Sequence, residues 1–226
     1  MPPFDSAVFP NPFKPLVVGT PYAETSQQLS LQRQRVRRAE ILATTRRVLA
    51  ETGHERLTLK RISAECDIAI QTIRNSFGRR EDLIVSAVNE HTTCIWQTLA
   101  KVSPGPAAFI DFSNMIYACA LQAPDFLRGT LTIAFANNPS LLVLQGHAAA
   151  TKTGLLKKMA TQDLLRPGID VDLLAAQITK LDTILMYEWS QNNNAEDLFR
   201  QMAAGHKVLL LGALRESAAM RIENQH

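Results

Sequence analysis

The chain has 226 residues, of which 46% are hydrophobic and 20% are charged, and its net charge is +3. This length permits one large domain or two small ones with a hydrophobic core. No apolar run reaches the ~18 residues that a transmembrane helix needs, and the first ten residues lack the basic start and apolar centre of a signal peptide. We therefore expect a globular, cytoplasmic protein that does not enter a membrane.

Residues 1–30 are rich in proline and show no sustained periodicity. Proline lacks the backbone N–H and clashes with the preceding helical turn, so this segment is not expected to hold a helix. We expect a flexible N-terminal arm, either disordered or laid across the surface, with Phe4, Phe9 and Phe13 available to pack against the body.

Residues Gln32–Glu51 have the apolar spacing of an amphipathic helix, and Gly53 is positioned to end it in a left-handed conformation. Four arginines crowd the start of this helix: Arg33, Arg35, Arg37 and Arg38. Positive charge at a helix N-terminus opposes the macrodipole, and a nearby anion such as a DNA phosphate relieves that conflict. A solvated basic end is the alternative interpretation.

The stretch Leu57–Leu83 predicts a helix-turn-helix followed by the start of a third helix. Thr58 is a good N-cap for the first short helix. The apolar pattern breaks at Asp67 and resumes in a second short helix, which would bury Ile73 and Phe77. In such a motif the second helix enters the DNA major groove.

The charge distribution favours nucleic-acid binding by this stretch. Residues 31–90 contain twelve Lys or Arg and eight Asp or Glu, a net charge of +4, whereas residues 91–226 contain eleven of each. The positive excess therefore lies with the helix-turn-helix, where a phosphate-facing surface requires it.

The rest of the chain is helical by pattern, and no segment shows the alternation of a strand, so we predict an all-α protein. Asp170 is a candidate N-cap. The expected helices run from Arg80 to about Lys101, Ala107 to about Leu121, Asp125 to about Ala136, Pro139 to Leu165, Asp170 to about Asn192, and Ala195 to about Met220.

The motifs of Arg38–Val88 are familiar as a set: Gly53, Leu57-Thr58, Ile62-Ser63-Ala64, Ile68-Ala69, Thr72-Ile73, Phe77 and Arg80-Glu81-Asp82-Leu83. They resemble the DNA-binding domain of the TetR family of transcriptional regulators. Three positions depart from the family pattern: Asp67 stands where Gly is usual, Arg74 where Tyr is usual, and Arg80 where Lys is usual. Asp tolerates the left-handed conformation, so we expect the turn to survive.

The resemblance implies an arm (1–30), a three-helix helix-turn-helix DNA-binding domain (31–80) and a helical ligand-binding and dimerisation domain (81–226). It also implies a ligand-responsive repressor that a small apolar or aromatic effector releases from DNA, with no enzymatic activity and no cofactor. One alternative is a small-molecule binding or scaffold protein whose DNA-binding head has lost specificity, which Asp67 and Arg74 motivate. A regulator or activator without a ligand is another.

Helical geometry divides the predicted DNA contacts into two groups. Residues facing the groove are Ile70, Gln71, Arg74 and Asn75. Residues better placed for phosphates are Thr58, Thr72, Ser76 and Arg80. Gln and Asn can pair with adenine, and Arg with guanine, so the first group would read the sequence of the double-stranded DNA. The alternative is that these polar residues only solvate an exposed helix face.

The family's regulators form homodimers through their last two long helices, and the sequence is compatible with that. The helix after Asp170 has an apolar stripe, and the last helix is rich in small residues that permit close helix approach. An intramolecular core is the alternative. Two heads would read half-sites about 34–36 Å apart, so the operator should be a near-palindrome.

The resemblance places an effector pocket among the middle helices of the same domain. The aromatic and soft residues available there are Trp96, Phe109, Phe112, Met115, Tyr117 and Phe135, with Asn114 or His147 as polar groups that orient the ligand. An ordinary hydrophobic core explains the same spacing.

Motifs for other chemistry are absent from the sequence. His91 and Cys94 share a helix face, but no third metal ligand is evident nearby, so no metal site is expected. There is no P-loop, Gly-x-Ser-x-Gly or His-Glu-x-x-His. The three cysteines are widely spaced and predict buried thiols rather than disulfides.

Overall fold

The computed structural model describes residues 11–16, 26–102, 105–135 and 139–223. The chain divides into two compact units. The first, called the head unit below, contains Asn11–His91 and Asp125–Leu142; the second, called the body unit, contains Thr92–Pro124 and Val143–His226. The predicted division at residue 80 follows sequence motifs and stays a prediction.

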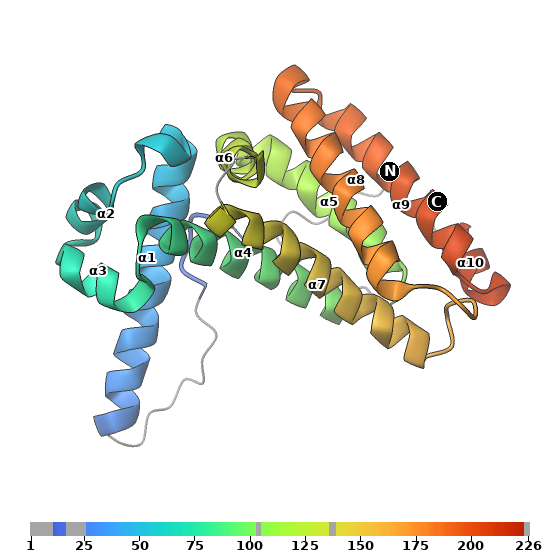
Figure 1. Ribbon diagram of the computed structural model, residues 1–226, viewed down its shortest axis with the longest axis horizontal. Helices are drawn as coiled ribbons and strands as arrows, with labels where there is room; N and C mark the ends of the chain where they lie inside the picture. The colour runs from blue at the N-terminus through green and yellow to red at the C-terminus, as the bar shows by residue number, and fades with distance from the viewer. Residues whose placement is uncertain (1–10, 17–25, 103–104, 136–138, 224–226) are drawn as a thin grey trace. The chain divides into compact units, whose positions relative to one another are not determined.

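The described residues are helical apart from turns, short linkers and one isolated β-bridge, as the all-α prediction requires (Figure 1). The helices are α1 (Ser26–Arg56), α2 (Leu59–Cys66), α3 (Ile70–Phe77), α4 (Arg80–Val102), α5 (Ala107–Gln122), α6 (Pro124–Phe135), α7 (Pro139–Thr161), α8 (Val171–Asn192), α9 (Ala195–Ala213) and α10 (Glu216–Glu223).

Helix α1 begins at Ser26, six residues before the predicted start, because no proline or glycine follows Pro21 to interrupt it. Gly53 breaks the helical geometry with φ 72° and ψ 171°. The positive φ is the one expected, but ψ lies far from the left-handed helical value. The chain resumes a helical turn and ends at Arg56, so Gly53 is a kink near the end of α1.

The helix-turn-helix has the predicted local structure. The Thr58 hydroxyl accepts from the backbone N–H of Arg61 at 3.2 Å and so caps α2. Asp67 ends α2 in the left-handed conformation, with φ 53° and ψ 47°. Ser63 closes the turn twice, since its carbonyl accepts from Ile68 N and its hydroxyl donates to Ile68 O at 2.6 Å. The departure from the usual Gly is therefore accommodated.

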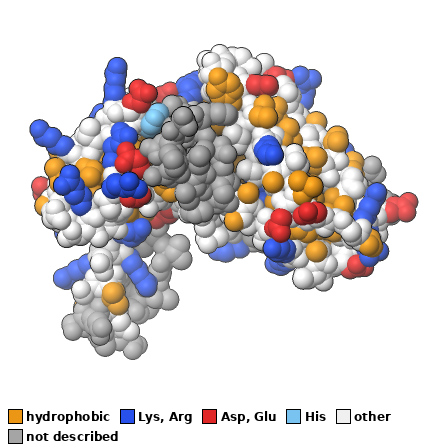
Figure 2. Space-filling view, in the orientation of Figure 1, with side chains coloured by type: hydrophobic (Ala, Val, Ile, Leu, Met, Phe, Trp, Pro, Cys, Tyr) orange, Lys and Arg blue, Asp and Glu red, His pale blue; other side chains and the backbone are white. Residues whose placement is uncertain are grey.

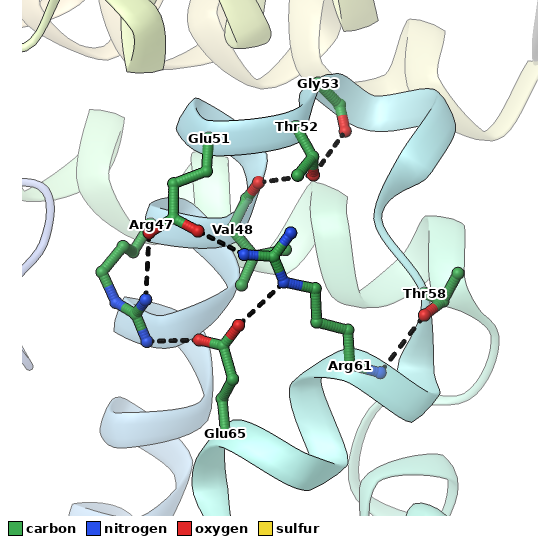
Figure 3. A network of polar contacts seen from close by, with 8 residues as sticks. All are labelled: Arg47, Val48, Glu51, Thr52, Gly53, Thr58, Arg61 and Glu65. Atoms are coloured by element: carbon green, nitrogen blue, oxygen red, sulfur yellow. Dashed lines mark hydrogen bonds and ion pairs between the residues drawn. The ribbon is translucent and has the colours of Figure 1, made fainter.

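A network of four charged side chains attaches α2 to α1 (Figure 3). Arg47 pairs with Glu51 at 3.0 Å and also with Glu65, while Arg61 pairs with Glu65 at 2.8 Å and also with Glu51. Hydrogen bonding to Arg61 has the largest effect on the pKa of Glu65. Together with the bond to Arg47 and the charges of both arginines, it holds this pKa below its ordinary value against the opposing effect of burial. The network holds α2 in addition to the packing of its buried residue Ile62.

Part of the N-terminal arm lies against the head unit. Pro12 is buried, and the Phe13 ring meets the Phe126 ring edge-on with 6.1 Å between centroids. The buried guanidinium of Arg46 donates to the carbonyls of Pro12 and Lys14. For residues 11–16 the surface-bound alternative therefore holds, whereas Phe4 and Phe9 lie outside the described residues.

In the body unit, α9 packs against both α5 and α8. The N-caps of the last two long helices are side-chain acceptors: Asp170 accepts from Leu173 N at 2.9 Å, as predicted, and Asn194 accepts from Asp197 N at 3.1 Å. Helices α8 and α9 come close at Gly205, where an added Cβ would lie 2.5 Å from Leu181 Cδ2.

Two predicted helix ends in this unit are wrong. The helix from Pro139 ends at Thr161 instead of Leu165, and the last predicted helix is interrupted at Leu214. Asp163 has a positive φ of 56° just after the first helix, and Leu214 is extended at the end of the second. Leu165 and Leu214 form an antiparallel bridge, in which Arg166 N donates to Ala213 O at 2.8 Å. Both segments are extended there, and α10 begins after the break.

The cysteines of the chain are free thiols, and burial raises the pKa of the Cys119 thiol to about 12, so it stays protonated. Within the described ranges, no helix is long and apolar enough to cross a membrane. The same part of the chain has no group of three or more His, Cys, Asp or Glu arranged to hold a metal ion.

Candidate functional site

Helix α3 has one buried and one exposed face. Ile73 and Phe77 are buried in the head unit, as predicted. The predicted DNA contacts Gln71, Arg74, Asn75 and Ser76 are exposed, whereas Ile70 and Thr72 are half-buried. The structure thus gathers four of the predicted polar residues on the accessible side of one short helix. Thr58, the N-cap of α2, is also exposed.

Two of these residues already interact. The Gln71 side-chain amide donates to Asn75 Oδ1 at 2.8 Å, across one turn of the helix. The pair leaves the Gln71 carbonyl and the Asn75 amide group on the exposed face, so an acceptor and a donor lie next to Arg74. An adenine edge presents this donor and acceptor combination in the major groove.

Arg38 connects the long first helix to α3. Its guanidinium lies 4.2 Å from the centroid of the Phe77 ring and donates to Ser76 O at 3.2 Å. A cation stacked on an aromatic ring and bonded to a helix-end carbonyl orients α3 relative to α1. Arg38 therefore has a structural role that its position in a run of arginines did not reveal.

Arg80 was predicted to contact phosphate, and the structure gives it other partners. Its Nη1 donates to His54 O at 2.9 Å and to Leu57 O at 3.3 Å, and its Nε donates to Glu81 Oε1 at 2.9 Å. The side chain thus caps the carbonyl end of α1. A phosphate contact by Arg80 stays a prediction, and it would require some of these bonds to be exchanged.

The third and fourth turns of α1 carry exposed arginines. Because the helix begins at Ser26, the predicted conflict between these charges and the macrodipole at the helix start is wrong. Arg33, Arg35 and Arg37 are exposed, and Figure 2 shows Lys and Arg side chains along this projecting part of α1 and over α2 and α3. A positive surface of this kind attracts the DNA backbone independently of sequence.

The predicted effector residues in the body unit form an aromatic cluster. Trp96 stacks on Phe112 with 4.6 Å between centroids and meets Phe109 edge-on at 5.8 Å, and all three are buried. Met115 is buried on the same helix as Phe112, whereas Tyr117 is half-buried and contacts Phe199 instead. The side chains of Phe135 and His147 lie outside the described residues.

A buried polar cluster adjoins these rings, and the sequence analysis missed it. Lys152 Nζ lies 2.9 Å from Asp182 Oδ2, and Asp182 Oδ1 lies 2.6 Å from His206 Nε2, with all three side chains at most 2% exposed. Burial opposes the charged form of Asp182, but Lys152 and His206 outweigh it and hold its pKa below the ordinary value. The sequence could have indicated this cluster, because each of the helices α7, α8 and α9 has one ionisable residue at a position where the apolar pattern predicts core.

Comparisons with solved structures bear on this architecture. A regulator from Rhodococcus sp. described as a TetR-family transcriptional regulator superposes with a TM-score of 0.62 at 13% identity, over 77% of this chain and 98% of that chain. The regulator FadR from Bacillus subtilis, solved with stearoyl-CoA, gives 0.60 at 16% identity over 76% and 97%. SmeT, the repressor of a Stenotrophomonas maltophilia multidrug efflux pump, gives 0.59 at 16% identity over 80% and 92%.

This chain has the fold of the TetR-family regulators. The resemblance inferred from Arg38–Val88 is thereby confirmed at the level of the fold, and the match extends over most of each compared chain. No protein-family model and no curated protein matches the sequence. The TetR-type fold was therefore recognisable from a few local motifs although overall sequence identity to these structures is low.

Within this TetR-type body, Ser113, His206 and Asp182 lie in the order of a hydrolase triad. Ser113 Oγ is 3.0 Å from His206 Nδ1, but the same nitrogen is 2.9 Å from the carbonyl of Phe109. A carbonyl oxygen only accepts, so Nδ1 carries a proton and does not act as the base for the serine. The cluster is a binding or structural feature, not a nucleophile with its base.

The outer faces of α8 and α9 expose apolar side chains. Ile184 and Tyr187 on α8 are 54% and 45% exposed, and Val208 on α9 is 71% exposed. The small residues Ala204 and Gly212 are exposed beside Val208 on α9. Figure 2 shows hydrophobic side chains over the face of the unit that carries α8. Such a face suits a second helical pair.

Proposed function

We propose that this protein is a ligand-responsive transcriptional repressor that binds a near-palindromic operator in double-stranded DNA as a homodimer. The observation that carries the proposal is the exposed polar face of α3, which presents Gln71, Arg74 and Asn75 beside a turn that Asp67 keeps intact. The buried residues Ile73 and Phe77 and the contact with Arg38 fix the orientation of α3. A fixed helix with exposed Gln, Arg and Asn side chains fits DNA recognition better than a scaffold role.

In this proposal the predicted roles of the head residues are retained. The base-reading residues are Ile70, Gln71, Arg74 and Asn75. The phosphate-contacting residues are Thr58, Thr72, Ser76 and Arg80. The exposed arginines of α1 add attraction to the DNA backbone, which raises affinity without sequence preference.

Dimerisation would use the exposed apolar faces of α8 and α9. Two such helical pairs form a four-helix interface in which Ile184, Tyr187 and Val208 are covered. A two-fold dimer presents its two α3 helices to half-sites about 34–36 Å apart, and this symmetry is the reason to expect a palindrome.

An effector would bind in the body unit and shift the population of dimers away from the spacing that fits the operator. The stacked Trp96–Phe112 pair supports an apolar or aromatic effector. One protein of the same fold was solved with stearoyl-CoA, which supports ligand binding, and another is the repressor of an efflux pump, which supports repression.

A selection experiment tests the DNA-binding part directly. The full-length protein is incubated with random genomic fragments at two salt concentrations, and the bound fragments are sequenced. We expect one palindromic sequence to be enriched and to survive the higher salt, because base contacts add to the salt-sensitive phosphate contacts. Uniform binding that disappears at the higher salt would contradict the proposal and favour a head without specificity.

A further inference from the structure

The polar cluster in the body unit leaves buried hydrogen-bonding groups unpaired. An ammonium group has three N–H donors. Within the part of the chain that the structure describes, Lys152 Nζ forms an ion pair with Asp182 Oδ2 at 2.9 Å, but that oxygen receives no hydrogen bond. His206 Nε2 meets the other oxygen of Asp182. All three side chains are buried.

The hydrogen-bond partners of His206 leave it no acceptor for Lys152. Nδ1 faces the Phe109 carbonyl at 2.9 Å and donates to it, because a carbonyl oxygen only accepts. Nε2 faces Asp182 Oδ1 at 2.6 Å. Both ring nitrogens thus already face oxygens, and Lys152 gains no acceptor from the imidazole.

The aromatic rings next to Lys152 do not replace the missing acceptor. Nζ lies 5.5 Å from the Trp96 centroid and 5.2 Å from the Phe112 centroid. These nearly equal distances place the ammonium beside the stacked pair instead of over the outer face of one ring. Ring contact at this range restores little of the hydration that a buried ammonium loses.

The indole N–H of Trp96, the ring beside Lys152, has no hydrogen-bond acceptor among the described residues. Trp96 is 4% exposed, and its Nε1 makes no hydrogen bond within the part of the chain that the structure describes. Buried indole N–H groups ordinarily find an acceptor. An unsatisfied N–H and an under-satisfied ammonium thus belong to neighbouring side chains inside the body.

We propose that Lys152 and Trp96 bind the carboxylate of an apolar or aromatic acid, and that this acid is the effector. A carboxylate supplies two acceptor oxygens for the two donors, and hydrogen bonds to an ionised acceptor are the strong ones. A doubly charged phosphate would bring more negative charge into the interior than a carboxylate does. The inference rests on the proposed role of the body unit as an effector-binding domain.

Matched ligand pairs on the full-length protein test the chemical class. Benzoate is compared with benzamide, and decanoate with decanol, by isothermal titration calorimetry and by the shift in melting temperature. We expect at least one of the acids to bind and to raise the melting temperature, and its neutral partner to bind at least about tenfold more weakly, since hydrogen bonds to charged groups are the strong ones. Equal affinity within both pairs, or no binding by either acid, would overturn the proposal. So would binding of phenyl phosphate in place of the acids.

Variants test the two residues. Lys152→Met keeps the apolar stem and removes the charge, and it should weaken acid binding at least about tenfold. Trp96→Phe removes the N–H and keeps the ring stack, and it should weaken acid binding about threefold or more. Lys158→Met is the matched control, because Lys158 is an exposed lysine on the same helix. Trp96→Phe keeps every charge, so it remains a test even if Lys152→Met fails to fold. Unchanged acid affinity in Trp96→Phe would show that the Trp96 N–H does not bind the acid.

The DNA selection separates the two proposals. If a palindrome is enriched and no acid binds, the carboxylate site is wrong and the regulator stands. If acids bind through Lys152 and no DNA sequence is enriched, the carboxylate site stands and the proposed regulator is wrong.

Discussion

The Arg46 guanidinium donates to Glu90 from one helix to another, with Nη1 2.7 Å from Oε2, and its side chain is completely buried. The same group donates to the carbonyls of Ala87 and, in the N-terminal arm, of Pro12 and Lys14. One arginine thus joins α1, α4 and the arm.

Arg46→Met should destabilise the head unit because it leaves several buried acceptors unpaired. The expected loss in free energy of unfolding is about 3 kcal/mol. Arg47→Met is the control, since Arg47 is the next residue on the same helix but is exposed; removing its ion pairs should cost less than about 1 kcal/mol. Urea denaturation of both variants measures the difference, and equal losses would contradict the role given to Arg46.

Gly205 should be less tolerant of alanine than Gly154. Alanine in place of an exposed helical glycine stabilises by about 0.5–1 kcal/mol, and nothing lies within 4 Å of a Cβ at Gly154. At Gly205 the new Cβ would meet Leu181 Cδ2 at 2.5 Å, so Leu181 must move and the gain should be offset or reversed. Thermal unfolding gives both values; a Gly205→Ala variant as stabilised as Gly154→Ala would refute the close approach.

The contribution of Glu65 to stability should depend on pH. Its pKa in the folded protein is lowered, chiefly by hydrogen bonding to Arg61, so its stabilisation is fully present above the unfolded pKa of about 4.3 and is lost as the pH falls through the lower folded value. Glu65→Gln should therefore cost up to about 1 kcal/mol at pH 7 and much less in acid. Denaturation of both proteins from pH 7 downward measures this, and a constant difference would rule the ion pairs out as its source.

Arg74→Ala should weaken binding to the selected operator without changing dimerisation. Loss of one good base or phosphate contact costs about 1–3 kcal/mol. Arg200→Ala, which removes an exposed arginine of the body unit, is the control for net charge. Fluorescence anisotropy with labelled operator provides the affinities. If Arg74→Ala and Arg200→Ala bind alike, Arg74 has no specific role.

Val208→Glu should separate the homodimer, since it places a charge in the proposed apolar interface of α8 and α9. Leu121→Glu is the matched control, because Leu121 is 59% exposed on α5, a helix outside the α8–α9 pair. Sedimentation equilibrium should find a monomer in the first case and a dimer in the second. A dimer in both cases would exclude this face as the interface.

The sequence by itself determined which segments are helical, although not all of their ends, and it determined the turn and the caps of α2 and α8. Thr58, Asp67 and Asp170 act on backbone groups within five residues, so their roles follow from local chemistry and were predicted correctly. The apolar periodicity likewise identified Ile73 and Phe77 as core, because a helix repeats its faces whatever it packs against.

Only the tertiary structure decided the roles of the buried charges. Lys152, Asp182 and His206 occupy core positions on three helices, and Arg46 meets the N-terminal arm 32 and 34 residues away. Sequence spacing reports which residues share a helix face but not which faces meet. A charge is stable in the interior only beside a specific partner, and that partner is known only once the helices are packed.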